Sequence, residues 1–201
     1  PSRMAFNWAR WVSYEAGMRF PPGCVAQALR VGPVPARVAG TIANPREDNV
    51  ADSEASSQDL LRARFGIDVP DAEVPDAIRF LLDRRVTRRY TDQDVPDALL
   101  DGLLAAAQSA PAKSDLQQYS VVVMRDKARI KQIADWIGTM DWIKGAPVFL
   151  VFCADIFRGR EICRMHGMAH ANDNLDTFLN ASVDAALAMA FAMQAADALG
   201  L

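Results

Sequence analysis

The sequence predicts an α+β domain, arranged as a three-layer α-β-α sandwich, because of its composition and two apolar runs. Of the 201 residues, 51% are hydrophobic and 23% are charged, which is typical of a globular chain with a sizeable core. The runs at 119–124 and 147–153 have the β-branched and aromatic content of strands. Because the second run is apolar on both faces, it needs helices against both faces. Segments of helical periodicity flank both runs and can supply them.

Residues 1–73 differ in composition from the rest of the chain. Pro21-Pro22-Gly23 stops any early helix, and large apolar side chains are scarce from Val31 to Glu73. Such a stretch buries too little surface to offset its ordering entropy. We therefore expect a poorly structured extension with one short helix near residues 57–64, and a domain at 74–201. An alternative is that the extension comes from an upstream reading frame.

The first helix of the domain is expected to begin at Pro75-Asp76, where proline suits the first turn. Its apolar stripe consists of Ile78, Leu81 and Leu82. The helix runs into Arg84-Arg85-Val86-Thr87-Arg88-Arg89-Tyr90, and Thr91–Asp94 is expected to form a turn.

A second helix is expected from Pro96-Asp97 to Ser109. It ends there because the residue before Pro111 is driven out of the helical region. Its inward side chains are expected to be Leu99, Leu100, Leu103, Leu104 and Ala107. A loop at 112–118 then leads into the first strand.

Asp126 is expected to cap a third helix that ends near Ile137, with Ile130, Ile133 and Ile137 facing inward. The second strand follows, and residues 155–172 are expected to be a polar connection. The longest helix, at 173–199, is apolar around most of its circumference, so it should be buried centrally or in a subunit interface. Its apolar residues are Leu175, Phe178, Leu179, Val183, Leu187, Met189, Phe191 and Met193.

The segment at 84–90 places four arginines within six positions. Guanidinium groups this close repel one another unless an anion lies among them or water screens them. Because their planar forks match phosphate oxygens, the segment is a candidate phosphate site. The alternative is a solvated basic turn, whose charges suit the end of a helix. Nucleic-acid binding is disfavoured, since the net charge is −3 and the pI is about 5.4.

The remaining composition excludes several other classes. Three cysteines without C-x-x-C spacing suggest neither a disulfide framework nor a zinc site, and a reducing cytoplasm is expected. His166 and His170 are four residues apart with Cys163 as their only soft neighbour, so a polar loop or helix start is expected there rather than a metal site. The sequence contains no run of about 18 apolar residues, so it indicates no membrane span. Three charged residues, Arg10, Glu15 and Arg19, interrupt every candidate apolar core of a signal peptide.

From Val74 onward the order of parts resembles the nitroreductase superfamily of FMN-dependent oxidoreductases. The matching parts are a helix, R-R-V-T-R-R-Y, an Ala-rich helix, A-P-A-K-S-D-L-Q-Q-Y with a Val-rich strand, W-I-K-G-A-P-V-F-L-V-F-C-A-D, and D-A-A-L-A-M-A-F-A-M-Q-A-A-D-A-L-G-L. The likeness covers residues 75–201 and is nearest to the flavin reductase and oxygen-insensitive nitroreductase branch. It implies the three-layer sandwich of that family.

The resemblance also implies a set of FMN ligands. The family's R-R-S-x-R pattern, which holds the FMN phosphate, falls on Arg84, Arg85, Val86 and Arg88, with Val86 contributing main chain only. The family loop that reaches the flavin ring falls on Pro111, Ala112, Lys113, Asp115 and Gln117. Ala112 and Asp115 depart from the family pattern, and Lys113 adds a cation that would favour a negatively charged reduced flavin.

The implied activity is hydride transfer from NAD(P)H to FMN, followed by reduction of a nitroaromatic, quinone or flavin acceptor by a ping-pong mechanism. No catalytic acid or base need be encoded, because the cofactor carries the chemistry. The family also implies a homodimer joined through the long helices, with FMN between subunits. Because relatives continue beyond the position of Leu201, the chain is expected to be the N-terminal part of such a domain. A non-catalytic fragment that holds no flavin is the alternative.

Overall fold

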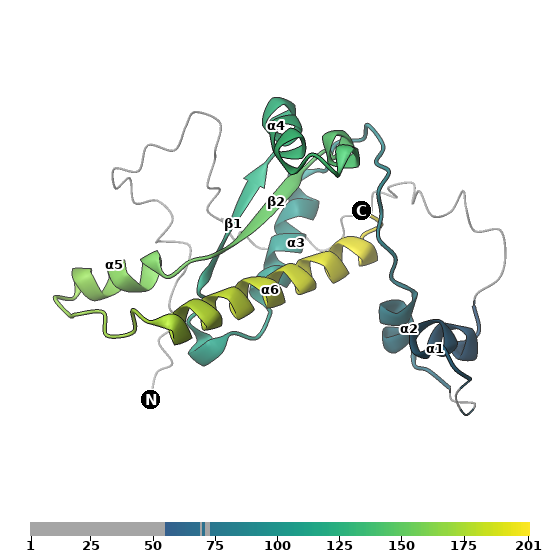
Figure 1. Cartoon of the computed structure of the whole chain (residues 1–201), viewed down its shortest axis with the longest axis horizontal. Coiled ribbons are helices and arrows are strands. Elements are labelled where there is room, and N and C mark those ends of the chain that lie inside the picture. Colours follow the sequence, from purple (N-terminus) through teal and green to yellow (C-terminus); the bar gives the residue numbers. More distant parts are fainter. Residues whose placement is uncertain (1–54, 69, 71–72) are drawn as a thin grey trace. The chain divides into compact units, whose positions relative to one another are not determined.

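The computed structural model describes residues 55–68, 70 and 73–201, which combine helices with a small sheet (Figure 1). Of the poorly structured extension expected at residues 1–73, residues 1–54, 69, 71 and 72 lie outside the described residues. The described chain forms two compact units, one of residues 88–193 and one of residues 55–87 and 194–201. The mixed α+β class is confirmed.

The sheet of the larger unit is an antiparallel pair of strands, β1 (Tyr119–Met124) and β2 (Phe149–Ala154). Tyr119 pairs with Ala154 at one end and Met124 with Phe149 at the other. The strands lie where the apolar runs predicted them, with β2 beginning two residues later. Their residues are half-buried, except for the exposed Ala154, so the described elements cover the sheet only in part.

The helix α3 (Asp97–Gln108) forms where Pro96 predicted its start. It buries Leu100, Leu103, Leu104 and Ala107, as expected from its apolar spacing. The hydroxyl of Tyr119 donates a hydrogen bond to the carbonyl of Ala107 at 3.3 Å, which ties β1 to the end of this helix.

The helix α4 (Lys127–Ile137) packs with the short helix η4 (Asp141–Gly145) at the end of the sheet where β1 finishes and β2 begins (Figure 1). The carboxylate of Asp126 accepts hydrogen bonds from the N–H groups of Ala128 and Arg129, which confirms the predicted cap. Ile130, Ala134 and Ile143 form a buried cluster. The prediction that Ile137 packs inward is wrong: it ends the helix and is 42% exposed.

Replacing Ile130 with alanine should lower the free energy of unfolding by about 2–5 kcal/mol, because it removes apolar contacts and leaves a cavity. Ile130 is fully buried, whereas Trp136 on the same helix is 75% exposed. Urea denaturation of Ile130→Ala and of the control Trp136→Ala checks this. The control should stay within about 0.5 kcal/mol of the parent, and equal losses in both variants would contradict the cluster.

The segment at 155–172, predicted to be a polar connection, contains the helix α5 (Phe157–Met165), and that prediction is wrong. The carboxylate of Asp155 accepts from the N–H of Phe157 at 2.9 Å and so satisfies an N-terminal donor. Ion pairs join Arg164 to Glu161 within the helix and Arg160 to Asp173 beyond it. These polar contacts stabilise a helix that is rich in charged residues and has no buried side chain among the described residues.

The longest helix, α6 (Leu175–Ala198), forms as predicted but packs with its small side chains. Its buried face consists of Thr177, Ala181, Asp184, Ala185, Ala188 and Ala192. The larger apolar residues Leu175, Phe178, Leu179 and Val183 are exposed in the single chain, so the described residues do not bury this helix on most sides. The other half of the prediction, burial in a subunit interface, stays a prediction. Small residues occupy the inner face because they let the helix approach its neighbours closely.

By length and composition α6 is also the one described helix that could cross a membrane, with a hydropathy of 1.2. This is weak evidence, because a packing helix of a folded domain passes the same test. The polar groups of Thr177 and Asp184 lie on its buried face, as in a helix that packs against protein.

The smaller unit contains α1 (Ser57–Phe65) and α2 (Asp76–Asp83). The helix α1 confirms the short helix predicted near 57–64, and it begins with a capping box between Ser56 and Asp59. Leu60 is buried, and the guanidinium of Arg79 on α2 donates to the carbonyl of Ala55 at 2.5 Å. At the other end, Arg64 donates to the carbonyls of Leu82 and Arg84. The helix α1 therefore caps the end of α2, directly before the arginine segment.

Candidate functional site

The arginine segment at 84–90 is extended chain that follows α2. Its first member, Arg84, is part-buried and forms an ion pair with Asp197 at 3.0 Å, near the end of α6. Arg85 is exposed and donates to the carbonyls of Leu82 and Arg84 at 3.2 and 3.1 Å. Its nearest carboxylate, that of Asp83, is 3.9 Å away, a weak pairing. Arg84 is therefore held by a charge, whereas Arg85 is held mainly by carbonyls.

Val86, Arg88 and Arg89 continue the segment as exposed residues. In the part of the chain that the structure describes, neither Arg88 nor Arg89 has a carboxylate partner. Two neighbouring guanidinium groups that are exposed and unneutralised can accept an anion without first breaking an ion pair. The anion site at Arg88 therefore stays a prediction, as does its alternative, a solvated basic turn.

The predicted flavin loop, residues 111–117, lies in the larger unit and contains the short helix η3 (Lys113–Asp115). Pro111, Lys113 and Asp115 are exposed, and Ala112 and Gln117 are half-buried. Ser114, Asp115 and Gln117 have φ angles of 52°, 56° and 47°. Positive φ is uncommon for residues other than glycine, so this loop is held in a strained conformation.

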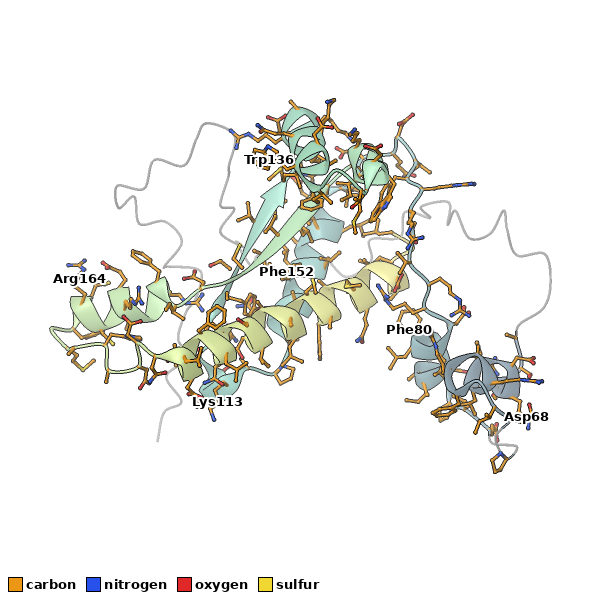
Figure 2. All side chains as sticks on the ribbon, in the orientation of Figure 1. Asp68, Phe80, Lys113, Trp136, Phe152 and Arg164 are labelled. Carbon is orange, nitrogen blue, oxygen red and sulfur yellow. The ribbon has the colours of Figure 1, made fainter. Side chains whose placement is uncertain are left out.

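A buried carboxylate on α6 holds the loop on one side. Asp184 is 2% exposed, and its two oxygens accept hydrogen bonds from the backbone N–H groups of Lys113 and Gln118, each at 3.0 Å. Figure 2 shows Lys113 beside α6. The two bonds satisfy a carboxylate that would otherwise be costly to bury.

Arg158 on α5 holds the loop from its carbonyl side, because its guanidinium donates to the carbonyls of Leu116 and Gln117. Burial lowers the pKa of Arg158, an effect that the nearby Asp155 opposes. Burial also raises the pKa of Tyr119, the residue that begins β1. The sequence did not point to Arg158 or Asp184; the one available indication was an acidic residue in the middle of an apolar helix.

Gln117 carries an unsatisfied polar atom in this loop. Its side-chain Oε1 is buried and has no hydrogen-bond donor among the described residues. Its Nε2 lies 3.4 Å from a carboxylate oxygen of Asp115. Buried acceptors are nearly always paired, so this oxygen is a candidate acceptor for a ligand N–H.

The described residues thus contain an exposed basic segment whose guanidinium groups can bind an anion and, described by itself, a strained polar loop with an unsatisfied acceptor. The chain belongs to the nitroreductase family, whose family model matches residues 81–201. The match includes the whole arginine segment and the loop, and it confirms the resemblance and the nitroreductase type of fold.

Among curated relatives, an FMN reductase [NAD(P)H] of Bacillus subtilis (strain 168) is 39% identical over 128 residues, which are 63% of this chain and 51% of that protein. An oxygen-insensitive NADPH nitroreductase of Salmonella typhimurium is 33% identical, over 62% of this chain and 50% of that protein. The solved structure of the hypothetical oxidoreductase YcnD from Bacillus subtilis matches with a TM-score of 0.60 and 38% identity, over 63% of this chain and 51% of that one. The chain thus spans about half the length of the curated relatives it matches.

Proposed function

We propose that the chain is part of an FMN-dependent oxidoreductase that passes a hydride from NAD(P)H to a nitroaromatic, quinone or flavin acceptor by a ping-pong mechanism. The observation that carries the proposal is the retention of the arginine segment within the family match at 81–201. The names of the relatives, FMN reductase and NADPH nitroreductase, support the cofactor and the co-substrate.

The guanidinium groups of Arg84, Arg85 and Arg88 are proposed to bind the phosphate of FMN, with the backbone of Val86 beside them. Arg88 suits this role because it is exposed and has no carboxylate partner among the described residues. Arg84 is held by Asp197 and therefore offers a guanidinium whose orientation is already fixed. Phosphate bound by arginine forks gains charge-assisted hydrogen bonds.

The residues at 111–117 fit the ring end of the same cofactor. The isoalloxazine ring has an N–H group, and the buried Oε1 of Gln117 lacks a donor among the described residues. Pro111, Ala112, Lys113 and Asp115 complete the loop that is proposed to lie against the flavin. A fixed loop contributes affinity because less conformational freedom is lost on binding.

FMN, when bound, would supply the hydride chemistry that links NAD(P)H to the acceptor. The chain's own residues bind and orient it. The arginine segment neutralises the phosphate, and the loop fixes the position of the ring. The cation of Lys113 would favour negative charge on a flavin ring held beside it. No side chain of the segment or loop is required as an acid or base.

A homodimer joined through α6 is part of the proposal. The exposed face of α6 carries a continuous apolar surface, formed by Leu175, Phe178, Leu179, Val183, Met189 and Met193. A second copy of the same face would cover this surface, and FMN would lie between subunits. The partners are then a second copy and small molecules, rather than nucleic acid or a membrane. A cytoplasmic location agrees with the free thiols of Cys153 and Cys163.

Flavin binding tests the proposal. The purified protein, mixed with FMN and freed of excess, should be yellow, show the flavin absorption bands and release FMN on heating. It should then oxidise NAD(P)H in the presence of a quinone or nitroaromatic acceptor. A colourless protein that aggregates would instead favour a fragment without flavin, an outcome that fits a match spanning about half the length of the curated relatives.

A further inference from the structure

The strained loop needs something to hold it. Ser114, Asp115 and Gln117 all lie in the left-handed region, which residues with a side chain enter at a steric cost. Such conformations persist only when the surrounding structure fixes them. Ser114 and Asp115 are exposed, so packing of their own side chains does not explain the conformation.

Asp184 and Arg158 supply the restraint from two different helices. The carboxylate of Asp184 on α6 accepts from the N–H groups of Lys113 and Gln118, which bracket the strained residues. The guanidinium of Arg158 on α5 donates to the carbonyls of Leu116 and Gln117, inside that bracket. A buried anion thus binds the donors of the loop and a part-buried cation binds its acceptors. Both N–H donors and carbonyl acceptors of the loop backbone therefore have protein side chains as hydrogen-bond partners.

The loop that contains these strained residues also carries an unsatisfied acceptor. Gln117 has a positive φ, its carbonyl binds Arg158, and its side-chain Oε1 is buried without a donor among the described residues. A loop that served only to connect α3 with β1 would gain by relaxing, since relaxation would remove the strain and expose Oε1 to water. The loop retains both the backbone strain and the unsatisfied acceptor, which indicates that its conformation is the one that binds a ligand.

We infer that Asp184 and Arg158 are positioning residues, which hold the loop at 113–118 in the conformation that receives the flavin ring. The inference rests on the proposed function and adds to it two residues outside the arginine segment and the loop. Neither residue touches the reacting atoms. Each acts through the backbone of the loop.

The test is Asp184→Asn in the whole protein. Asparagine keeps the shape but has one acceptor oxygen for two N–H groups, so one buried donor loses its partner. FMN and riboflavin should both bind about tenfold or more weakly, by the same factor, because the ring end is disturbed and the phosphate end is not. The ratio of affinities for oxidised and reduced flavin should also change, which a mere loss of folded protein would not produce. Asp176→Asn is the matched control, since Asp176 is exposed on the same helix.

A rescue experiment separates positioning from general stability. Adding Ser114→Gly to Asp184→Asn should restore at least part of the lost affinity, because glycine adopts positive φ without steric cost. If Asp184→Asn does not fold, Arg158→Gln tests the same restraint from the carbonyl side with the same readouts. Unchanged flavin affinity in a folded variant overturns the inference. It is also overturned if Ser114→Gly restores none of the affinity that Asp184→Asn loses. A parent protein that binds neither flavin overturns the proposed function instead.

Discussion

Replacing Arg85 and Arg88 together with alanine should weaken FMN binding about 100-fold or more and leave riboflavin binding within about twofold. Riboflavin lacks the phosphate, so the difference between the two ligands isolates the contribution of the basic segment. The magnitude follows from losing two charge-assisted hydrogen bonds, each worth about 1.5–3 kcal/mol. Fluorescence titration of each flavin against the parent and the variant measures it.

Arg84 is left in place in this experiment because it has a second role. Its guanidinium pairs with Asp197 at 3.0 Å, so its removal would disturb the end of α6 as well as any phosphate contact. Arg62→Ala is the control, since Arg62 is an exposed arginine of α1 whose carboxylate partner is Asp68. The phosphate assignment fails if the double variant loses both flavins equally, or if it binds FMN as the parent does.

The elements that the sequence predicted are those governed by local rules. Asp126 caps α4 because its own carboxylate reaches the first free N–H groups. Pro96 begins α3, and the Val-rich run forms β1. The helix α5 was not predicted because it depends on contacts with distant residues. Arg158 binds the loop after α3, and Arg160 pairs with Asp173. The segment has few large apolar side chains and contains Gly159, so its composition did not indicate a helix.

The candidate site was predictable only where residue type alone carries the chemistry. Clustered arginines suggest phosphate in any fold, and the family pattern then assigns the loop. Asp184 was out of reach because it lies 71 positions from Lys113, and only the folded chain brings the two together. The strain at Ser114 was equally invisible, since serine is not a residue that requires positive φ.

The helix α6 shows a further limit of periodicity. Its sequence is apolar around most of its circumference, which does not tell which face the domain itself uses. The structure assigns the inner face to Ala181, Ala185 and Ala188 and leaves the larger side chains exposed. An exposed surface with two leucines, a phenylalanine and two methionines is of the kind that marks a protein interface.

Leu179→Glu should therefore dissociate the homodimer proposed to form through α6 into monomers at micromolar concentration. Leu179 is 59% exposed in the single chain and lies within the apolar face of α6. In a two-fold dimer the change places two carboxylates in the same interface, each deprived of water and without a designed partner. The dimer dissociation constant should rise about 100-fold or more, since an unpaired buried charge costs several kcal/mol. Sedimentation equilibrium of parent and variant measures it.

The matched control is Trp136→Glu, which makes the same kind of change on the exposed side of α4. Trp136 is 75% exposed and lies outside the α6 face, so this variant should remain a dimer. If FMN lies between subunits, Leu179→Glu should also lose flavin in proportion to its dissociation, whereas the control should keep it. A dimer that survives Leu179→Glu but dissociates with Trp136→Glu would move the interface to α4. A parent that is monomeric at every concentration would leave the apolar face of α6 without the partner proposed for it.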